Sequence, residues 1–356
     1  MKQKVLAAMS GGVDSSAAVI LLKDDFDVVG VTLKLFDYAD EEKRGCCTEA
    51  DAVFAAQAAA KCGIPHYTFN YTELFTREVI EKFSRQYIDG LTPNPCIDCN
   101  TFVKFGALFD RADELGCDYI ATGHYAVCEF DQDSGRYLLK KSPSDKDQSY
   151  VLYTLTQENL SRVLFPLGAF TDKAEVRRLA FEHGFENHRK PDSQDICFVP
   201  DGDYAAFLRR FAGVKSEAGD FISQSGEVIG RHGGHLKYTI GQRRGLGVGF
   251  GKPMYVCGKN PQSNEVVLTE ESGLSSGGFV ANQLNWIAIE NLDGNLTCKV
   301  KTRYRQAEVP CEVTSTKDGG VRVEYAEPQK KAAPGQRAVF YDGNVVIGGG
   351  VIVGNL

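Results

Sequence analysis

The residues from Ser10 to Ser16 combine two glycines, three serines and one aspartate in a single short stretch. An apolar run at 5–8 precedes them and predicts a buried strand, and the apolar run at 17–22 predicts a helix. Gly11 and Gly12 would let the backbone bend and approach a ligand closely. The N–H groups at a helix start favour phosphate, so the stretch predicts an anion-binding loop. The alternative is an ordinary glycine-rich turn.

Two details refine this prediction. The lysine of the GxxxxGK[ST] pattern is absent, so this is not a Walker loop. The serine hydroxyls add hydrogen-bond donors, and Asp14 would either cap the helix or hold a magnesium ion.

Cysteines form the second group of candidate chemical residues. Cys96 and Cys99 make a Cys-x-x-Cys pattern in a proline-stiffened loop, and helix-like sequence resumes at Phe102. A helix start favours the thiolate form of a cysteine. Half of a zinc site is the alternative, although neither a second Cys-x-x-Cys nor a histidine pair completes it. Cys197 is isolated, which usually indicates a small buried apolar residue. The adjacent Cys46 and Cys47 cannot be placed from the sequence.

Alternating strand and helix patterns must position these residues. Strands are expected at 28–35, 66–71 and 119–122, with a helix at 49–61 that ends at Gly63. This alternation predicts a doubly wound parallel sheet, which binds ligands beyond the carboxyl ends of its strands. At that edge, Leu33 would line an adenine pocket or belong to the core. Gly123 would permit close backbone approach to a nucleotide. For His124 we expect a structural or capping role.

The pattern changes after residue 211 to short strands separated by glycines. These strands are expected at 221–223, 227–230, 254–256, 265–268, 297–302, 309–314, 321–325 and 338–341. Their spacing predicts a small β-rich domain followed by a β-barrel or sandwich. The predicted domains are therefore 1–210, 211–275 and 276–356.

Composition narrows the class of protein. The chain has 356 residues, enough for two or three domains, and its 11 scattered cysteines indicate reduced thiols rather than a disulfide framework. Neither a membrane-spanning apolar run nor a secretory signal is recognised, so we expect a cytoplasmic protein with no membrane partner. The net charge of −7 does not exclude nucleic acid, because a local basic patch can carry the binding.

Such a basic patch lies in the second half of the chain. Between Arg209 and Arg244 there are seven lysines and arginines against three acidic residues, and glycines flank Arg243–Arg244. A further row of basic residues is expected on one face of a single strand. Its members are Lys299, Lys301, Arg303 and Arg305. Both groups predict contacts with RNA phosphates.

Several motifs carry a resemblance to known families. SGGVDSS resembles the pyrophosphate loop of the PP-loop ATPases, which adenylate a substrate with ATP. With TPNPCIDCN, ATGHY, KDQSY and SQDICF in this order, and YTIGQRRGLG and RYR later, almost the whole chain resembles the tRNA-specific 2-thiouridylase (MnmA) family. This resemblance implies a Rossmann-like PP-loop domain. It also implies ATP-dependent replacement of the C2 oxygen of the wobble uridine (U34) by sulfur, with Mg²⁺ as a cofactor.

The resemblance also implies site residues and partners. Cys99 would be the nucleophile and Cys197 the persulfide carrier, and tRNAs for Glu, Gln and Lys would be the substrates. A cysteine desulfurase or a sulfur-relay protein would supply the persulfide. The implied nucleotide-binding residues are Ala8, Met9, Ser10, Gly11, Gly12, Val13, Asp14, Ser15, Leu33 and Gly123. Asn94, Pro95 and Cys96 would lie beside the target base, and Lys146, Asp147, Gln148, Arg303 and Tyr304 would join Arg243 and Arg244 in contacting tRNA.

One position departs from the family pattern. Many members carry aspartate where this chain has Cys96, so a candidate general base is lost, although Asp98 is adjacent to Cys99. Cys96, Cys99 and Cys197 would together suffice for a [4Fe–4S] cluster with one open iron, which is an alternative to the persulfide relay. Other PP-loop activities also stay open: a cytidine-directed tRNA thiolase, an amide-forming ligase, or a non-catalytic nucleotide-dependent RNA-binding protein.

Overall fold

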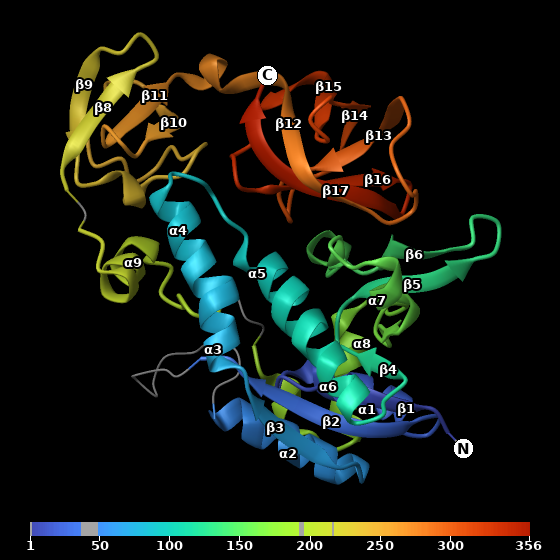
Figure 1. Ribbon diagram of the computed structural model, residues 1–356. Helices are drawn as coiled ribbons and strands as arrows, with labels where there is room; N and C mark the ends of the chain where they lie inside the picture. The colour runs from blue at the N-terminus through green and yellow to red at the C-terminus, as the bar shows by residue number, and fades with distance from the viewer. Residues whose placement is uncertain (1, 37–48, 192–195, 216) are drawn as a thin grey trace. The chain divides into compact units, whose positions relative to one another are not determined.

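The computed structural model describes residues 2–36, 49–191, 196–215 and 217–356 and divides into two compact units (Figure 1). Unit 1 comprises residues 1–80, 95–202 and 343–347, and unit 2 comprises 81–94, 203–342 and 348–356. Cys46 and Cys47 lie outside the described residues. No helix in the described part of the chain is long and apolar enough to cross a membrane.

Unit 1 is built on a five-stranded sheet in the order β3-β2-β1-β4-β7, with every neighbouring pair parallel. The strands are β1 (Lys4–Ala8), β2 (Asp27–Lys34), β3 (His66–Asn70), β4 (Tyr119–Ala121) and β7 (Val163–Leu164). Apolar runs make the central strands β1 and β2, which are buried because both faces of a parallel sheet are covered, whereas the edge strand β3 is largely exposed. The predicted parallel sheet is confirmed.

Helices cover both faces of this sheet (Figure 1). Residues of α1 (Val13–Leu22), α2 (Glu49–Cys62) and α8 (Lys173–Glu182) share one apolar core with the strands. Figure 1 shows α6 (Leu108–Glu114) on the opposite side of the sheet from α2. The remaining helical segments of unit 1 are α3 (Thr72–Phe75), η1 (Thr76–Glu81, which ends in unit 2), α5 (Pro95–Asp98), η2 (Cys99–Ala107), η3 (Ser149–Leu152), α7 (Gln157–Ser161) and η4 (Glu186–Arg189).

A hairpin that the sequence reasoning missed also belongs to unit 1. β5 (Ala126–Asp131) and β6 (Arg136–Lys141) pair in antiparallel fashion, and Lys140 pairs with Val345. The hairpin follows β4 directly, so it emerges at the carboxyl edge of the parallel sheet.

Unit 2 contains two β structures and the helices α4 (Lys82–Ile88) and α9 (Tyr204–Ala212). The first β structure is a four-stranded sheet, β10-β11-β8-β9, around an apolar core that includes Phe221 and Tyr238. Its strands are β8 (Gly219–Ser223), β9 (Val228–His232), β10 (Tyr255–Asn260) and β11 (Glu265–Thr269). The short one-turn segments η5 (His235–Lys237) and η6 (Glu271–Leu274) complete this region.

The second β structure is a closed six-stranded barrel in the order β12-β15-β14-β13-β16-β17, with β17 pairing back to β12. Its strands are β12 (Ser275–Trp286), β13 (Asn295–Lys301), β14 (Val309–Ser315), β15 (Val321–Lys330), β16 (Arg337–Asp342) and β17 (Val345–Asn355). The predicted basic row is wrong in part. β13 ends at Lys301, so Arg303 and Arg305 lie in the following turn rather than on the same strand face.

Candidate functional site

The loop between β1 and α1 leaves the helix start open for a ligand. The N-cap of α1 is Gly12, which has no side chain to accept a hydrogen bond from the helix N–H groups. At the starts of α8 and α9, by contrast, the side chains of Asp172 and Asp203 accept such bonds. The expectation that Asp14 caps α1 is therefore wrong, because Asp14 is the second residue of the helix. The first N–H groups of a helix have no partner within the helix, so they are available to an anion here.

The serines of this loop hold its shape rather than project from it. The Ser10 N–H donates to Ser15 Oγ at 3.1 Å, and Ser15 Oγ and Ser16 Oγ donate to the Gly12 carbonyl at 3.1 and 3.0 Å. Ser15 and Ser16 are buried, while Ser10 is exposed. Ser10 Oγ also lies 3.3 Å from Ser15 Oγ, but because Ser10 is exposed its hydroxyl is the one of the three that a phosphate oxygen can reach.

Gly11 shows why a glycine is required in this loop. Its φ is +71°, and a Cβ at this position would lie 2.1 Å from the Asp51 carbonyl oxygen. The Asn187 amide supports the same peptide, because Nδ2 donates to the Gly11 carbonyl and to Ser16 Oγ, both at 3.0 Å. Asn187 is 3% exposed, and the sequence reasoning missed it.

Asp14 is held from two directions. Its Oδ1 accepts a hydrogen bond from the Tyr125 hydroxyl and its Oδ2 one from Lys173 Nζ, each at 2.8 Å. Tyr125 follows β4, and Lys173 begins α8. Both carboxylate oxygens therefore have protein donors, which does not favour a direct bond to magnesium. Tyr125 is the last residue of the ATGHY motif, whereas no motif marks Lys173.

Gly123 lies close to protein backbone, and its expected approach to a nucleotide stays a prediction. A Cβ at this glycine would lie 2.7 Å from the Asp14 carbonyl carbon and from the Ser15 nitrogen. The close backbone approach is thus to the first turn of α1.

Leu33 is buried on β2, and the carbonyl of Met9 accepts a hydrogen bond from Thr32 Oγ1 at 2.7 Å. His124 is buried against Phe105 and Phe165, and burial lowers its pKa well below the usual value.

The Cys-x-x-Cys pattern lies inside a helix rather than before it. α5 begins at Pro95 and continues into η2, a π-helical segment that starts at Cys99, so helix formation does not wait until Phe102. Proline suits the first helical position because its missing N–H has no partner there. Cys96 is exposed and Cys99 is buried. Asn100 Nδ2 donates to the Val151 carbonyl at 3.0 Å, and Thr101 Oγ1 lies 2.7 Å from Thr154 Oγ1, which attaches this helix to the segment after Gln148.

Cys197 belongs to the same unit and is half-buried. Residues 192–195 of its motif lie outside the described part of the chain. The neighbouring Phe198 ring packs edge-on against Phe75 of α3, with 5.9 Å between ring centroids, and α3 contacts η2. Cys197 and Cys99 are therefore attached to the same packed region. No disulfide is formed among the cysteines of the described ranges.

The iron–sulfur alternative receives no support from the geometry. Among the described residues, which include Cys96, Cys99 and Cys197, no group of three or more His, Cys, Asp or Glu is arranged to hold a metal ion. The cluster therefore stays a hypothesis that rests on residue types alone.

The KDQSY segment has one exposed cation and two structural side chains. Lys146 is exposed. Asp147 Oδ1 accepts from the Ser142 and Ser149 N–H groups at 3.1 and 3.2 Å, which shapes the turn. Gln148 pairs with the backbone of Tyr125. Of the three, Lys146 is thus the residue suited to a phosphate contact.

In unit 2, the predicted arginines gather around one turn. Arg243 and Arg244 are exposed in the turn after Ile240, and Arg303 donates from Nη2 to the Ile240 carbonyl at 3.2 Å. Gln242 fixes the turn by accepting from the Thr239 N–H at 3.0 Å and donating to the Arg244 carbonyl at 2.9 Å. The Arg303 side chain of the barrel therefore contacts the turn that carries Arg243 and Arg244. Tyr304, which follows Arg303 in sequence, is exposed.

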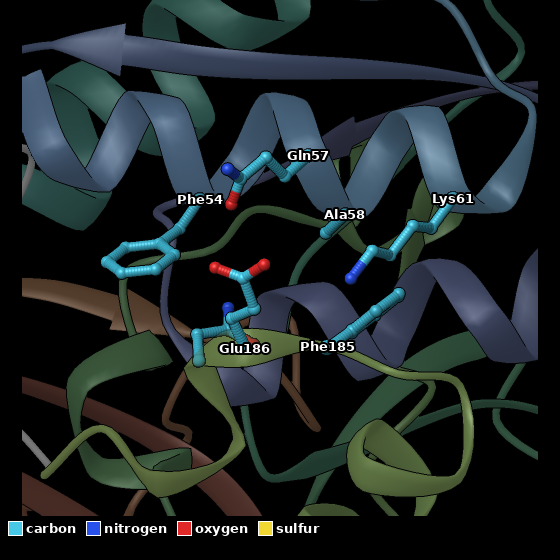
Figure 2. A pocket seen from close by; sticks show the side chains of 7 residues that line it. Phe54, Gln57, Ala58, Lys61, Phe185 and Glu186 are labelled. Carbon is cyan, nitrogen blue, oxygen red and sulfur yellow. The ribbon is translucent and has the colours of Figure 1, made fainter.

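The target-base residues lie where the two units join in sequence. Asn94 is half-buried and belongs to unit 2, whereas Pro95 is buried and belongs to unit 1. Figure 2 shows a pocket in unit 1 between α2 and the segment at Phe185–Asn187. At about 170 Å³ it is smaller than ordinary ligand pockets, and we assign no ligand to it.

Three family models match successive parts of the chain. Residues 3–201 match the tRNA methyl transferase HUP domain, 205–270 the tRNA methyl transferase PRC-barrel domain, and 276–352 the aminomethyltransferase beta-barrel domain. Among solved structures, NMN synthetase from Francisella tularensis aligns over 61% of this chain and 79% of its own, at 14% identity and a TM-score of 0.34. This similarity is too low to bear on function.

Curated relatives are much more similar and extend over the full length. The tRNA-specific 2-thiouridylase MnmA of Clostridioides difficile is 45% identical over 99% of this chain and 98% of its own. Its counterpart from Heliobacterium modesticaldum is 46% identical over 100% of this chain and 94% of its own. With an open PP-loop and two cysteine-bearing segments in one unit, the chain belongs to the MnmA family of tRNA-specific 2-thiouridylases.

Proposed function

We propose that this protein thiolates C2 of the wobble uridine of tRNA in an ATP-dependent reaction, with tRNAs for Glu, Gln and Lys as substrates. The observation that carries this proposal is the open helix start of α1 in the same unit as Cys99 and Cys197. An anion-binding loop supplies activation, and two thiols in one packed region supply sulfur transfer.

The first step is adenylation of the base. The C2 oxygen of uracil attacks the α-phosphorus of ATP, the bond between the α- and β-phosphates breaks, and pyrophosphate leaves. The N–H groups at the start of α1 and the exposed Ser10 hydroxyl would stabilise the departing pyrophosphate. Mg²⁺ carried on the ATP phosphates would supply further neutralisation of charge.

The second step replaces the activated oxygen. A persulfide on Cys197 is attacked by the Cys99 thiolate, which forms a Cys99–Cys197 disulfide and expels hydrosulfide. Hydrosulfide adds to C2, AMP leaves with the original oxygen, and loss of one proton gives 2-thiouridine. A thiol reductant then restores both cysteines, and a persulfide donor such as a cysteine desulfurase or a sulfur-relay protein reloads Cys197.

Recognition of tRNA would rest on local positive charge in a chain of net charge −7. Lys146 in unit 1 and the turn with Arg243, Arg244 and Arg303 in unit 2 are suited to phosphate contacts. The target base must leave its stack to reach the helix that bears Cys99, as in other base-modifying enzymes.

Pyrophosphate release with and without unmodified tRNA tests this function. We expect release that depends on tRNA and that persists in Cys99→Ser, since the thiols act after adenylation. Release that requires ammonia or an amino acid would indicate a ligase. Thiolated cytidine in the product would indicate a cytidine thiolase. If pyrophosphate is not released under any condition, the protein is a non-catalytic RNA-binding protein.

The iron–sulfur alternative has its own test. Protein purified without oxygen is assayed for iron and for absorption at roughly 400 nm, where iron–sulfur clusters absorb through charge transfer. The persulfide relay predicts full thiolation with a persulfide donor and no iron. Activity that scales with bound iron would replace the relay with a cluster on Cys96, Cys99 and Cys197.

A further inference from the structure

Tyr125 connects the nucleotide loop to the segment that carries Lys146–Gln148. It is 2% exposed, and its hydroxyl donates to Asp14 Oδ1 at 2.8 Å. Its backbone is paired twice with Gln148: the Tyr125 N–H donates to Gln148 Oε1 at 3.0 Å, and the Tyr125 carbonyl accepts from the Gln148 N–H at 2.8 Å. One rigid side chain therefore joins the first turn of α1 to this segment.

The same segment also holds the helix that bears Cys99. Beyond Gln148, the Val151 carbonyl accepts from Asn100 Nδ2, the residue after Cys99, at 3.0 Å. Thr154 then contacts Thr101 through their hydroxyls at 2.7 Å. The nucleotide loop, the Lys146–Gln148 turn and the Cys99 helix thus share one hydrogen-bonded connection within unit 1.

We propose that Tyr125 is a positioning residue that couples tRNA binding at Lys146–Gln148 to the nucleotide loop through Asp14. A shift of Gln148 on tRNA binding moves the Tyr125 backbone, and the buried ring carries that shift to the Asp14 carboxylate. Lys173 holds the other oxygen of Asp14 from α8. Loss of the Tyr125 hydroxyl should therefore remove the coupling and leave the loop itself in place.

This inference rests on the proposed function, because it takes tRNA and ATP as the two ligands. The coupling is a single factor: if tRNA lowers the Kd of the nucleotide by some factor, the nucleotide lowers the Kd of tRNA by the same factor. Typical couplings are about 5- to 150-fold. This factor is the Kd of a ligand measured alone divided by its Kd in the presence of the other ligand. A mutation that changes both Kd values equally leaves the factor unchanged, whereas a mutation that removes the coupling brings it to one.

The test uses the full chain, unmodified tRNA and α,β-methylene ATP, which cannot be cleaved at the relevant bond. The Kd of each ligand is measured with and without the other for the wild type, Tyr125→Phe and Tyr119→Phe. The control removes a hydroxyl at the opposite end of β4, where Tyr119 Oη accepts from Gln3 at 3.4 Å. We expect about tenfold coupling in the wild type and the control. In Tyr125→Phe we expect a factor within about twofold of one, with the Kd for nucleotide alone changed less than about threefold.

Unchanged coupling in Tyr125→Phe, or no coupling in the wild type, overturns the inference. Neither result touches the proposed function, which is judged separately by formation of 2-thiouridine in wild-type protein. If Tyr125→Phe does not fold, as judged by circular dichroism, Gln148→Met replaces it. That variant removes the acceptor of the Tyr125 N–H and leaves the Gln148 N–H bond to the Tyr125 carbonyl, so it should weaken the coupling. Coupling as strong as in the wild type contradicts the inference.

Discussion

Gly123→Ala separates two explanations for this glycine. If Gly123 only makes room for a nucleotide, alanine leaves the unliganded protein as stable as the wild type. If it makes room for α1, alanine destabilises the protein before any ligand binds. A Cβ would lie 2.7 Å from two backbone atoms of Asp14 and Ser15 and 2.9 Å from the Ser15 Cα. Backbone atoms cannot rotate away, so the start of α1 must shift.

Overpacking of this kind costs about 1–3 kcal/mol. At about 2–4 °C per kcal/mol for a domain of this size, the melting temperature should fall by roughly 2–12 °C. Because the shifted turn carries the N–H groups assigned to pyrophosphate, KM for ATP in tRNA-dependent pyrophosphate release should also rise. Gly277→Ala is the matched control, since a Cβ there meets nothing within 4 Å. A wild-type melting temperature in Gly123→Ala would refute the packing argument, even if KM rises.

Three other predictions follow from the contacts. Asn187→Ala removes two hydrogen bonds from the nucleotide loop. It should therefore lower the free energy of unfolding, measured by urea titration, by about 1–3 kcal/mol and raise KM for ATP. If both values are unchanged, Asn187 does not support the loop. Arg243→Ala with Arg244→Ala should weaken tRNA binding and reduce its log–log salt slope by about one to two, while ATP binding is spared; an unchanged slope would remove this turn from the RNA site. Burial lowers the folded-state pKa of His124, so the unfolded state binds more protons below the ordinary pKa of about 6.5, and stability should fall as pH drops below that value. His124→Gln should make urea-measured stability less dependent on pH in this range, and an equally steep dependence would argue against it.

The sequence predicted the parallel sheet well because its strands are short, apolar and regularly alternated with helices. The barrel was predicted with gaps for a physical reason. β17 contains Gly348 and Gly350, which read as turn residues, yet a Cβ at either would lie 2.4–2.7 Å from the carbonyl oxygens of Asn285 and Asn282 on β12. Those glycines permit the close pairing that closes the barrel, a long-range requirement with no local signal.

In the nucleotide loop, too, the residues of the loop itself could be predicted from the sequence, whereas the distant residues that support it could not. Its glycines and serines marked the site directly. Asn187 and Lys173, which hold Gly11 and Asp14, come from segments more than a hundred positions away and have side chains that are ordinary on any surface. The start of the Cys99 helix at Pro95 was missed because two prolines indicate a loop, although one of them is well placed as a first helical residue.

The most direct test of the central claim is mass spectrometry of tRNA after reaction with ATP and a persulfide donor. We expect 2-thiouridine at the wobble position with the wild-type protein. We expect none with Cys99→Ser or Cys197→Ser, although both variants should stay folded and release pyrophosphate. Wild-type levels of 2-thiouridine in either variant would contradict the assigned sulfur transfer.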